Sequence, residues 1–181
     1  MSAFEKICYI YDRIRLVNDE TWESPGLSRD AIAKMFKDID LSPQSLLFAL
    51  YEWHNGIYNL QAFFHLLSLS ESIDTYNSYK AEKNEYPHSK WQTCLFPMFS
   101  MNGDVDIFMD MNAGSLIAID REGGSFEEIA VHYENYLNAL IEVFESGLFI
   151  FEDVSGSINI NKAFWQNMLQ KYKIKNAWWK D

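Results

Sequence analysis

The 181-residue chain lacks the features that mark several broad classes of protein. Its two cysteines, Cys8 and Cys94, are too few for a disulfide-stabilised scaffold. No run approaches the roughly 18 apolar residues of a membrane-spanning helix, and the charged N-terminal stretch has no apolar signal core. Only 8 glycines and 4 prolines, beside 48% hydrophobic residues, exclude a disordered chain. These absences predict a single, reduced, cytoplasmic domain over residues 1–181.

Common catalytic and ligand-binding motifs are also missing. There is no phosphate-binding loop, GxGxxG, GxSxG or HExxH. The histidines never fall three or four positions apart and neither cysteine belongs to a CxxC pair, so no metal site is predicted. A nucleophilic pair of Cys94 with a distant histidine stays open, although its neighbours favour an apolar core role. We expect no cofactor.

The whole chain has a net charge of −11, and basic residues are scarce in its middle part. Residues 61–160 contain 16 acidic and 4 basic side chains, and between residues 91 and 153 Arg121 stands alone against 12 carboxylates. Such a charge distribution repels nucleic acid and anionic lipid and attracts basic partners. The alternative interpretation is that the acidic residues serve only the solubility of the protein. We therefore expect no direct binding of nucleic acid or membrane.

The C-terminal residues 161–181 reverse this trend, with 5 basic side chains and 1 acidic one. Two interpretations are open for this segment. It folds back on the acidic part of the chain, or it forms the contact of a homodimer. Trp178 and Trp179 suit either arrangement.

Three N-terminal helices are predicted from capping residues that precede apolar residues at helical spacing. A capping box at Ser2 begins a helix over residues 3–18, and a turn-rich stretch follows it. Ser28 begins the second helix. Ser42-Pro43 begins the third helix, which Asn55-Gly56 is expected to end.

The hydrophobic period changes after residue 60. Strands are predicted over residues 62–67, 95–99, 104–111 and 115–120, the last two forming a hairpin. A helix from Ser70 to Tyr79 and a polar loop over residues 80–90 lie between the first two strands.

Residues 126–132 are ambiguous, since they fit the start of one long helix or a strand at 128–131 before a helix from 133. A strand at 148–151 and a basic helix at 162–173 follow. This order predicts an α+β fold. We expect a mainly antiparallel sheet of about five or six strands, with helices packed on one side and at both chain ends.

Asp104, Asp106, Phe108 and Asp110 share one face of the strand predicted over residues 104–111. The aspartates could bind a divalent metal, act as paired carboxylates in glycoside hydrolysis, or form the solvated face of a docking surface. The spacing lacks the glycine and closing glutamate of a calcium loop, and the sequence predicts no cleft. The docking surface is favoured, because a basic partner would relieve the repulsion between close carboxylates.

Residues 26–56 (GLSRDAIAKMFKDIDLSPQSLLFALYEWHNG) resemble the opening of the SUKH superfamily, which includes the yeast cell-wall-assembly regulator and bacterial toxin-immunity proteins. The stretch Leu95–Phe99, the Gly103-Asp104 turn and the strands ending at Asp110 and Asp120 are also similar. The resemblance covers about residues 27–146, leaving the helix 3–18 and an extension over 148–181 outside. Ser42 before the proline, and His132 where a capping serine is usual, depart from the family pattern.

The resemblance implies a strand near 128–131 and a non-catalytic binding module. Bacterial members neutralise a toxin by docking on it, so we expect stoichiometric binding of a cognate toxin domain with a basic surface, such as a nuclease. The partner-binding residues are predicted to be Asp104, Asp106, Phe108, Asp110 and Glu122. A regulatory scaffold without a toxin partner is the alternative, and a metal-dependent hydrolase is a third hypothesis.

Overall fold

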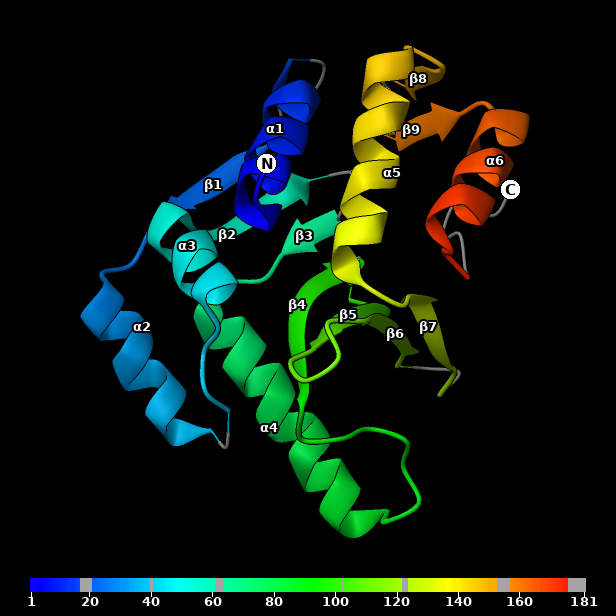
Figure 1. Ribbon diagram of the computed structural model, residues 1–181. Helices are drawn as coiled ribbons and strands as arrows, with labels where there is room; N and C mark the ends of the chain where they lie inside the picture. The colour runs from blue at the N-terminus through cyan, green and yellow to red at the C-terminus, as the bar shows by residue number, and fades with distance from the viewer. Residues whose placement is uncertain are drawn as a thin grey trace.

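A computed structural model describes residues 1–16, 21–39, 41–60, 64–101, 103–121, 124–152 and 157–175. Within them, seven antiparallel strands form one sheet whose spatial order follows the chain order (Figure 1). These strands are β1 (Trp22–Pro25), β2 (His54–Leu60), β3 (Phe64–Leu66), β4 (Leu95–Met101), β5 (Val105–Asp110), β6 (Leu116–Asp120) and β7 (Phe126–Ala130). The α+β fold is confirmed, with more strands than the five or six expected. Strand β7 resolves the ambiguity at 126–132 in favour of a strand.

The N-terminal helices follow their predicted caps in two of three cases. Helix α1 (Ala3–Arg15) begins with the complete capping box at Ser2, and α2 (Arg29–Met35) has Ser28 as its N-cap. A short 3-10 turn over Phe36–Asp38 extends α2. The predicted cap at Ser42-Pro43 is wrong, since α3 (Ser45–Trp53) begins after Gln44. The Gln44 side chain donates to the carbonyl of Met111 and so ties the start of α3 to the β5–β6 turn.

The segment around β1 and β2 differs from the sequence prediction. The stretch read as turn-rich contains β1, which pairs with β2 along the edge of the sheet. Helix α3 ends at Trp53, directly before the predicted stop at Asn55-Gly56, and these two residues already belong to β2, where Gly56 has a φ of +105°. A Cβ at Gly26 would lie 1.9 Å from the Glu52 carbonyl oxygen, so only glycine allows the chain to pass there.

Helix α4 (Leu69–Glu85) is longer than predicted, because residues 80–85 continue the helix instead of forming a loop. Ser68 and Glu71 form a capping box at its start, and Tyr58 donates to Glu71 Oε1 at 2.9 Å. Burial alone would raise the pKa of Glu71, but hydrogen bonds from Ser68 and Tyr58 outweigh it and lower the pKa. The polar residues that suggested a loop occupy the solvent side of α4.

Helices cover both faces of the sheet, which corrects the expectation of helices on one side. Neighbouring residues of a strand point to opposite faces. Phe108 of β5 meets Tyr79 of α4 edge to face, with ring centroids 5.1 Å apart. The next residue, Met109, lines a small cavity with Ile7 of α1 and Leu137 of α5 (Tyr133–Ser146). The central strands are therefore buried on both sides.

The C-terminal segment folds back on the acidic part of the chain, as one of the two interpretations expected. Strands β8 (Phe149–Glu152) and β9 (Ser157–Ile160) form a separate hairpin that leads into α6 (Lys162–Tyr172) (Figure 1). Lys171 pairs with Glu142 of α5 at 2.5 Å, and Lys175 pairs with Glu128 of β7 at 2.7 Å. Trp178 and Trp179 lie outside the described residues. No described helix combines the length and apolar character needed to cross a membrane.

Candidate functional site

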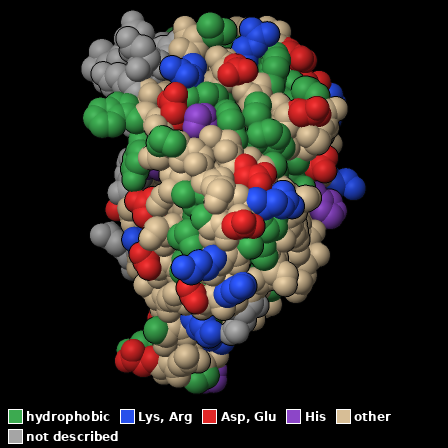
Figure 2. Space-filling view, turned by 90° about the vertical axis from the view of Figure 1, so that its left-hand side faces the viewer, with side chains coloured by type: hydrophobic (Ala, Val, Ile, Leu, Met, Phe, Trp, Pro, Cys, Tyr) green, Lys and Arg blue, Asp and Glu red, His purple; other side chains and the backbone are tan. Residues whose placement is uncertain are grey.

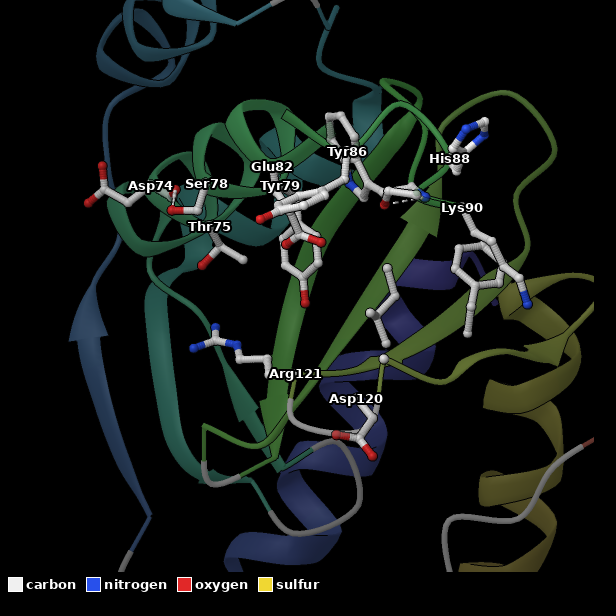
Figure 3. A pocket seen from close by; sticks show the side chains of 15 residues that line it. Asp74, Thr75, Ser78, Tyr79, Glu82, Tyr86, His88, Lys90, Asp120 and Arg121 are labelled. Carbon is white, nitrogen blue, oxygen red and sulfur yellow. Dashed lines mark hydrogen bonds between the residues drawn. The ribbon is translucent and has the colours of Figure 1, made fainter. Parts of the chain in front are cut away.

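A groove of about 680 Å³ opens between α4 and the ends of β6 and β7 (Figure 3). One wall is formed by α4, which contributes Asp74, Tyr79 and Glu82. The segment after α4 closes one end with Tyr86, His88 and Lys90, while Arg121 and Phe126 line the opposite side. Because aromatic side chains, hydroxyl groups and charged groups converge on this groove, we treat it as the candidate site.

A buried carboxylate holds Arg121 at the edge of this groove. Arg121 Nε donates to Asp106 Oδ2 at 2.6 Å and its Nη2 donates to Oδ1 at 2.8 Å. The Tyr79 hydroxyl donates to the same Oδ2 at 3.1 Å. The Asp106 side chain is fully buried, whereas 44% of the Arg121 side chain is exposed. The pair therefore presents a charged guanidinium to solvent in a fixed orientation.

The register of the hairpin explains this geometry. Asp106 of β5 lies opposite Ile119 of β6, and Arg121 follows Ile119 by two residues, which returns it to the same face of the sheet. The Arg121 amide also donates to the Asp104 carbonyl at 2.9 Å, which fixes the backbone beyond the strand end. The hairpin thus uses the single basic residue of the 91–153 stretch to neutralise its own buried carboxylate.

The electrostatic environment of this cluster raises the pKa of both Arg121 and Tyr79. The hydrogen bonds and charge of Asp106 raise the pKa of Arg121 against the opposing effect of burial. Burial and the negative charge of Asp106 raise the pKa of Tyr79, so its hydroxyl stays protonated and donates.

The structure separates the residues predicted to bind a partner. Asp104 is exposed at the turn before β5. Asp106 and Phe108 are fully buried, so the prediction of one solvated face is wrong for both. Asp110 is half-buried, and its Oδ1 accepts from the amides of Asn112 and Ala113 at 2.8 and 2.9 Å. Glu122 lies outside the described residues.

The cause of this error is the cover that α4 places over the second face of the sheet. The alternation of residues 104–111 does predict their strand correctly. Whether the polar side of a strand faces solvent depends on what packs against it. Here Tyr79 packs on that side, so Asp106 became an internal partner of Arg121 instead of a surface charge.

Internal ion pairs remove part of the acidic surface that the sequence suggested. Lys6 of α1 pairs with Glu134 at 3.1 Å, in addition to the two C-terminal pairs described above. The face on the left-hand side of Figure 1 carries acidic and basic side chains interspersed (Figure 2). By contrast, Asp74, Glu82 and Asp104 are exposed and make no ion pair with another described residue. Exposed carboxylates without a described ion partner are therefore found along α4 and at the β4–β5 turn, and also elsewhere on the described surface, as at Asp12, Asp30 and Glu127.

Metal and thiol chemistry find little support in the part of the chain described here. No three of its His, Cys, Asp or Glu side chains lie close enough to hold a metal ion. Cys94 Sγ lies 3.8 Å from Gln92 Oε1, and burial together with the charge of Asp110 raises the pKa of the thiol. A raised pKa reduces the fraction of thiolate, the form that acts as a nucleophile.

Comparison with known protein-family models and with curated proteins finds no match to this chain. The groove was not predicted from the sequence, because its walls come from α4 and from the end of β6 with the start of β7, which are far apart in the chain. The isolation of Arg121 among carboxylates was the one signal that pointed to it. The site is suited to non-covalent binding, since it combines aromatic walls, hydroxyl groups and charges of both signs.

Proposed function

We propose that the protein is a non-catalytic binding module of the cytoplasm that neutralises a toxin by docking on it. The toxin domain would carry a basic surface, such as that of a nuclease. The resemblance to the SUKH superfamily supports this proposal, since its bacterial members act in this way. The fold agrees in class with that expectation, because six of the seven strands of the antiparallel sheet follow helices α1 to α3.

The observation that carries the proposal is the placement of unneutralised carboxylates beside the groove. Asp74, Glu82 and Asp104 are exposed, and Lys171 and Lys175 of the C-terminal segment pair with carboxylates of α5 and β7. Arg121, which lines the groove, already belongs to Asp106, and Lys90 lies at the end of the groove formed by the segment after α4. An uncompensated acidic edge accelerates association with a basic protein and weakens as salt rises.

Capture of partners from the native host tests the proposal. The tagged protein is expected to retain one dominant basic polypeptide in near-equal amount, and recovery should fall at high salt. Recovery of many substoichiometric partners would favour a regulatory scaffold instead. Failure to retain any polypeptide at low salt would overturn the proposal.

A charge-reversed pair of variants locates the surface. Asp74, Glu82 and Asp104 form the acidic edge. Asp104→Lys should slow association with the captured partner roughly two- to tenfold at low salt, because it reverses one charge of this edge. Asp12→Lys makes the same change of net charge on an exposed position of α1 and serves as the control. Equal association rates for the two variants would exclude the acidic edge from the interface.

A further inference from the structure

We propose that the groove between α4 and the β6–β7 end binds an extended basic segment of the partner protein. This inference rests on the proposed function and adds the kind of chain segment that the module recognises. It assigns the groove a ligand with two features, backbone carbonyl groups and a lysine or arginine side chain.

The buried donor is the indole of Trp91, which lines the groove. Only 1% of this residue is exposed, and its Nε1–H has no acceptor among the described residues. Buried polar groups in folded proteins nearly always have a partner. An unpaired buried donor beside a groove of this size therefore favours a ligand that brings a hydrogen-bond acceptor.

Arg121 supplies the second set of donors. A guanidinium has five N–H groups in a fixed fork, and Asp106 accepts from two of its nitrogens. Because 44% of the side chain is exposed, part of the fork faces the solvent of the groove. Asp106 already balances its charge, so a neutral carbonyl oxygen is a better match than a full negative charge. An extended peptide presents such oxygens at regular intervals along its length.

The α4 wall supplies the charge that selects a basic side chain. Figure 3 shows Asp74, Ser78, Tyr79 and Glu82 along this wall, with Arg121 across from them. Glu82 is exposed and lies one turn beyond Tyr79. A lysine or arginine of the ligand can therefore pair with Glu82 while its stem lies against the Tyr79 ring.

The opposite end of the groove fixes the direction of the ligand. Lys90 is exposed there, next to His88, and would repel a second cation. Tyr86, 58% exposed, offers an aromatic surface next to them. The ligand is accordingly expected to place its basic side chain toward Asp74 and Glu82, and an apolar side chain against Tyr86.

The test uses a fluorescein-labelled, amidated peptide of about ten residues with alternating lysine and valine. Saturable binding is expected, and Glu82→Lys should weaken it about fivefold or more. Glu85→Lys, an equal charge change three residues further along α4 at a position that does not line the groove, should weaken it less than about twofold. Equal losses in the two variants, or tighter binding of a matched glutamate–valine peptide, would overturn the inference.

The indole N–H resonance of Trp91 provides a second readout. The chain has 6 tryptophans, and the Trp91 signal is assigned by its loss in Trp91→Phe, which keeps an aromatic ring. Addition of the lysine–valine peptide is expected to shift this signal downfield, as a new acceptor forms a hydrogen bond. An unmoved Trp91 signal at saturating peptide would contradict the assignment of the groove.

The captured partner separates this inference from the proposed function. If wild type and Glu82→Lys retain the same basic partner with equal affinity, the groove is not its binding site and the proposed function stands. If wild type retains no partner, the proposed function fails, while the peptide titration still decides whether the groove takes a basic segment.

Discussion

Replacing Arg121 by alanine tests whether Asp106 depends on its ion pair. The variant leaves a carboxylate that is fully buried, with the Tyr79 hydroxyl as its remaining described partner. The Arg121 side chain is 44% exposed, so the loss of its own packing costs little free energy of unfolding. The Asp106→Ala variant leaves no buried charge without a partner, because the remaining Arg121 side chain can turn fully to solvent. The two truncations of one ion pair are therefore expected to differ.

The structure sets the size of that difference. Removing one partner of a fully buried pair costs about 3–5 kcal/mol. Arg121→Ala should cost about 2–3 kcal/mol, since water can approach Asp106 through the space that the exposed side chain leaves. Asp106→Ala should cost about 1–2 kcal/mol, mainly for the small cavity and the unpaired Tyr79 hydroxyl.

Urea unfolding at pH 7 measures both variants, with equal m-values as the condition for comparing their free energies of unfolding. Arg121→Lys is the matched control, because it keeps the charge but loses the two-point geometry. Its loss should fall below that of Arg121→Ala. A larger loss in Asp106→Ala than in Arg121→Ala would refute the reasoning, and so would an Arg121→Ala variant as stable as wild type.

Three further outcomes follow from particular contacts. Gly26→Ala should cost about 2 kcal/mol in free energy of unfolding, because its Cβ would lie 1.9 Å from the Glu52 carbonyl oxygen. The lowered pKa of Glu71 gives stabilisation that is present above its ordinary value of 4.5 and is lost as pH falls through the folded pKa. The stability difference between wild type and Glu71→Gln should therefore shrink below that pH in urea titrations. Burial first, then nearby carboxylates, raise the pKa of Cys8 to about 11 and that of Cys94 in the same direction, so iodoacetamide should modify both slowly in the folded protein.

Each outcome has its own control. A Cβ at Gly103 would meet no atom within 4 Å, so Gly103→Ala is strained only by the positive φ of +85°. Its free energy of unfolding should fall by about 1 kcal/mol. A Gly26→Ala loss no larger than this would argue against the close approach. A constant stability difference for Glu71→Gln from neutral to acid pH would contradict the lowered pKa. Alkylation of the folded protein as fast as that of the urea-unfolded chain would contradict protection of the thiols.

Local signals in the sequence predicted the elements whose formation depends on their own residues. The capping box at Ser2 and the N-cap at Ser28 start their helices as expected. The alternation of residues 104–111 and the following turn give the β5–β6 hairpin. Where a competing contact acted, the prediction failed, as when the anchoring of Gln44 to Met111 moved the start of α3.

Long-range packing decided the candidate site. The sequence by itself determined the α+β class, the acidic middle and the basic C-terminal segment, because composition and periodicity are local properties. It gave no sign that α4 would cover the second face of the sheet and turn Asp106 from a surface charge into the buried partner of Arg121. The residue pattern of a strand is the same whether its polar side faces water or a packed helix. Only the tertiary structure distinguishes the two, since burial depends on residues that are distant in the chain.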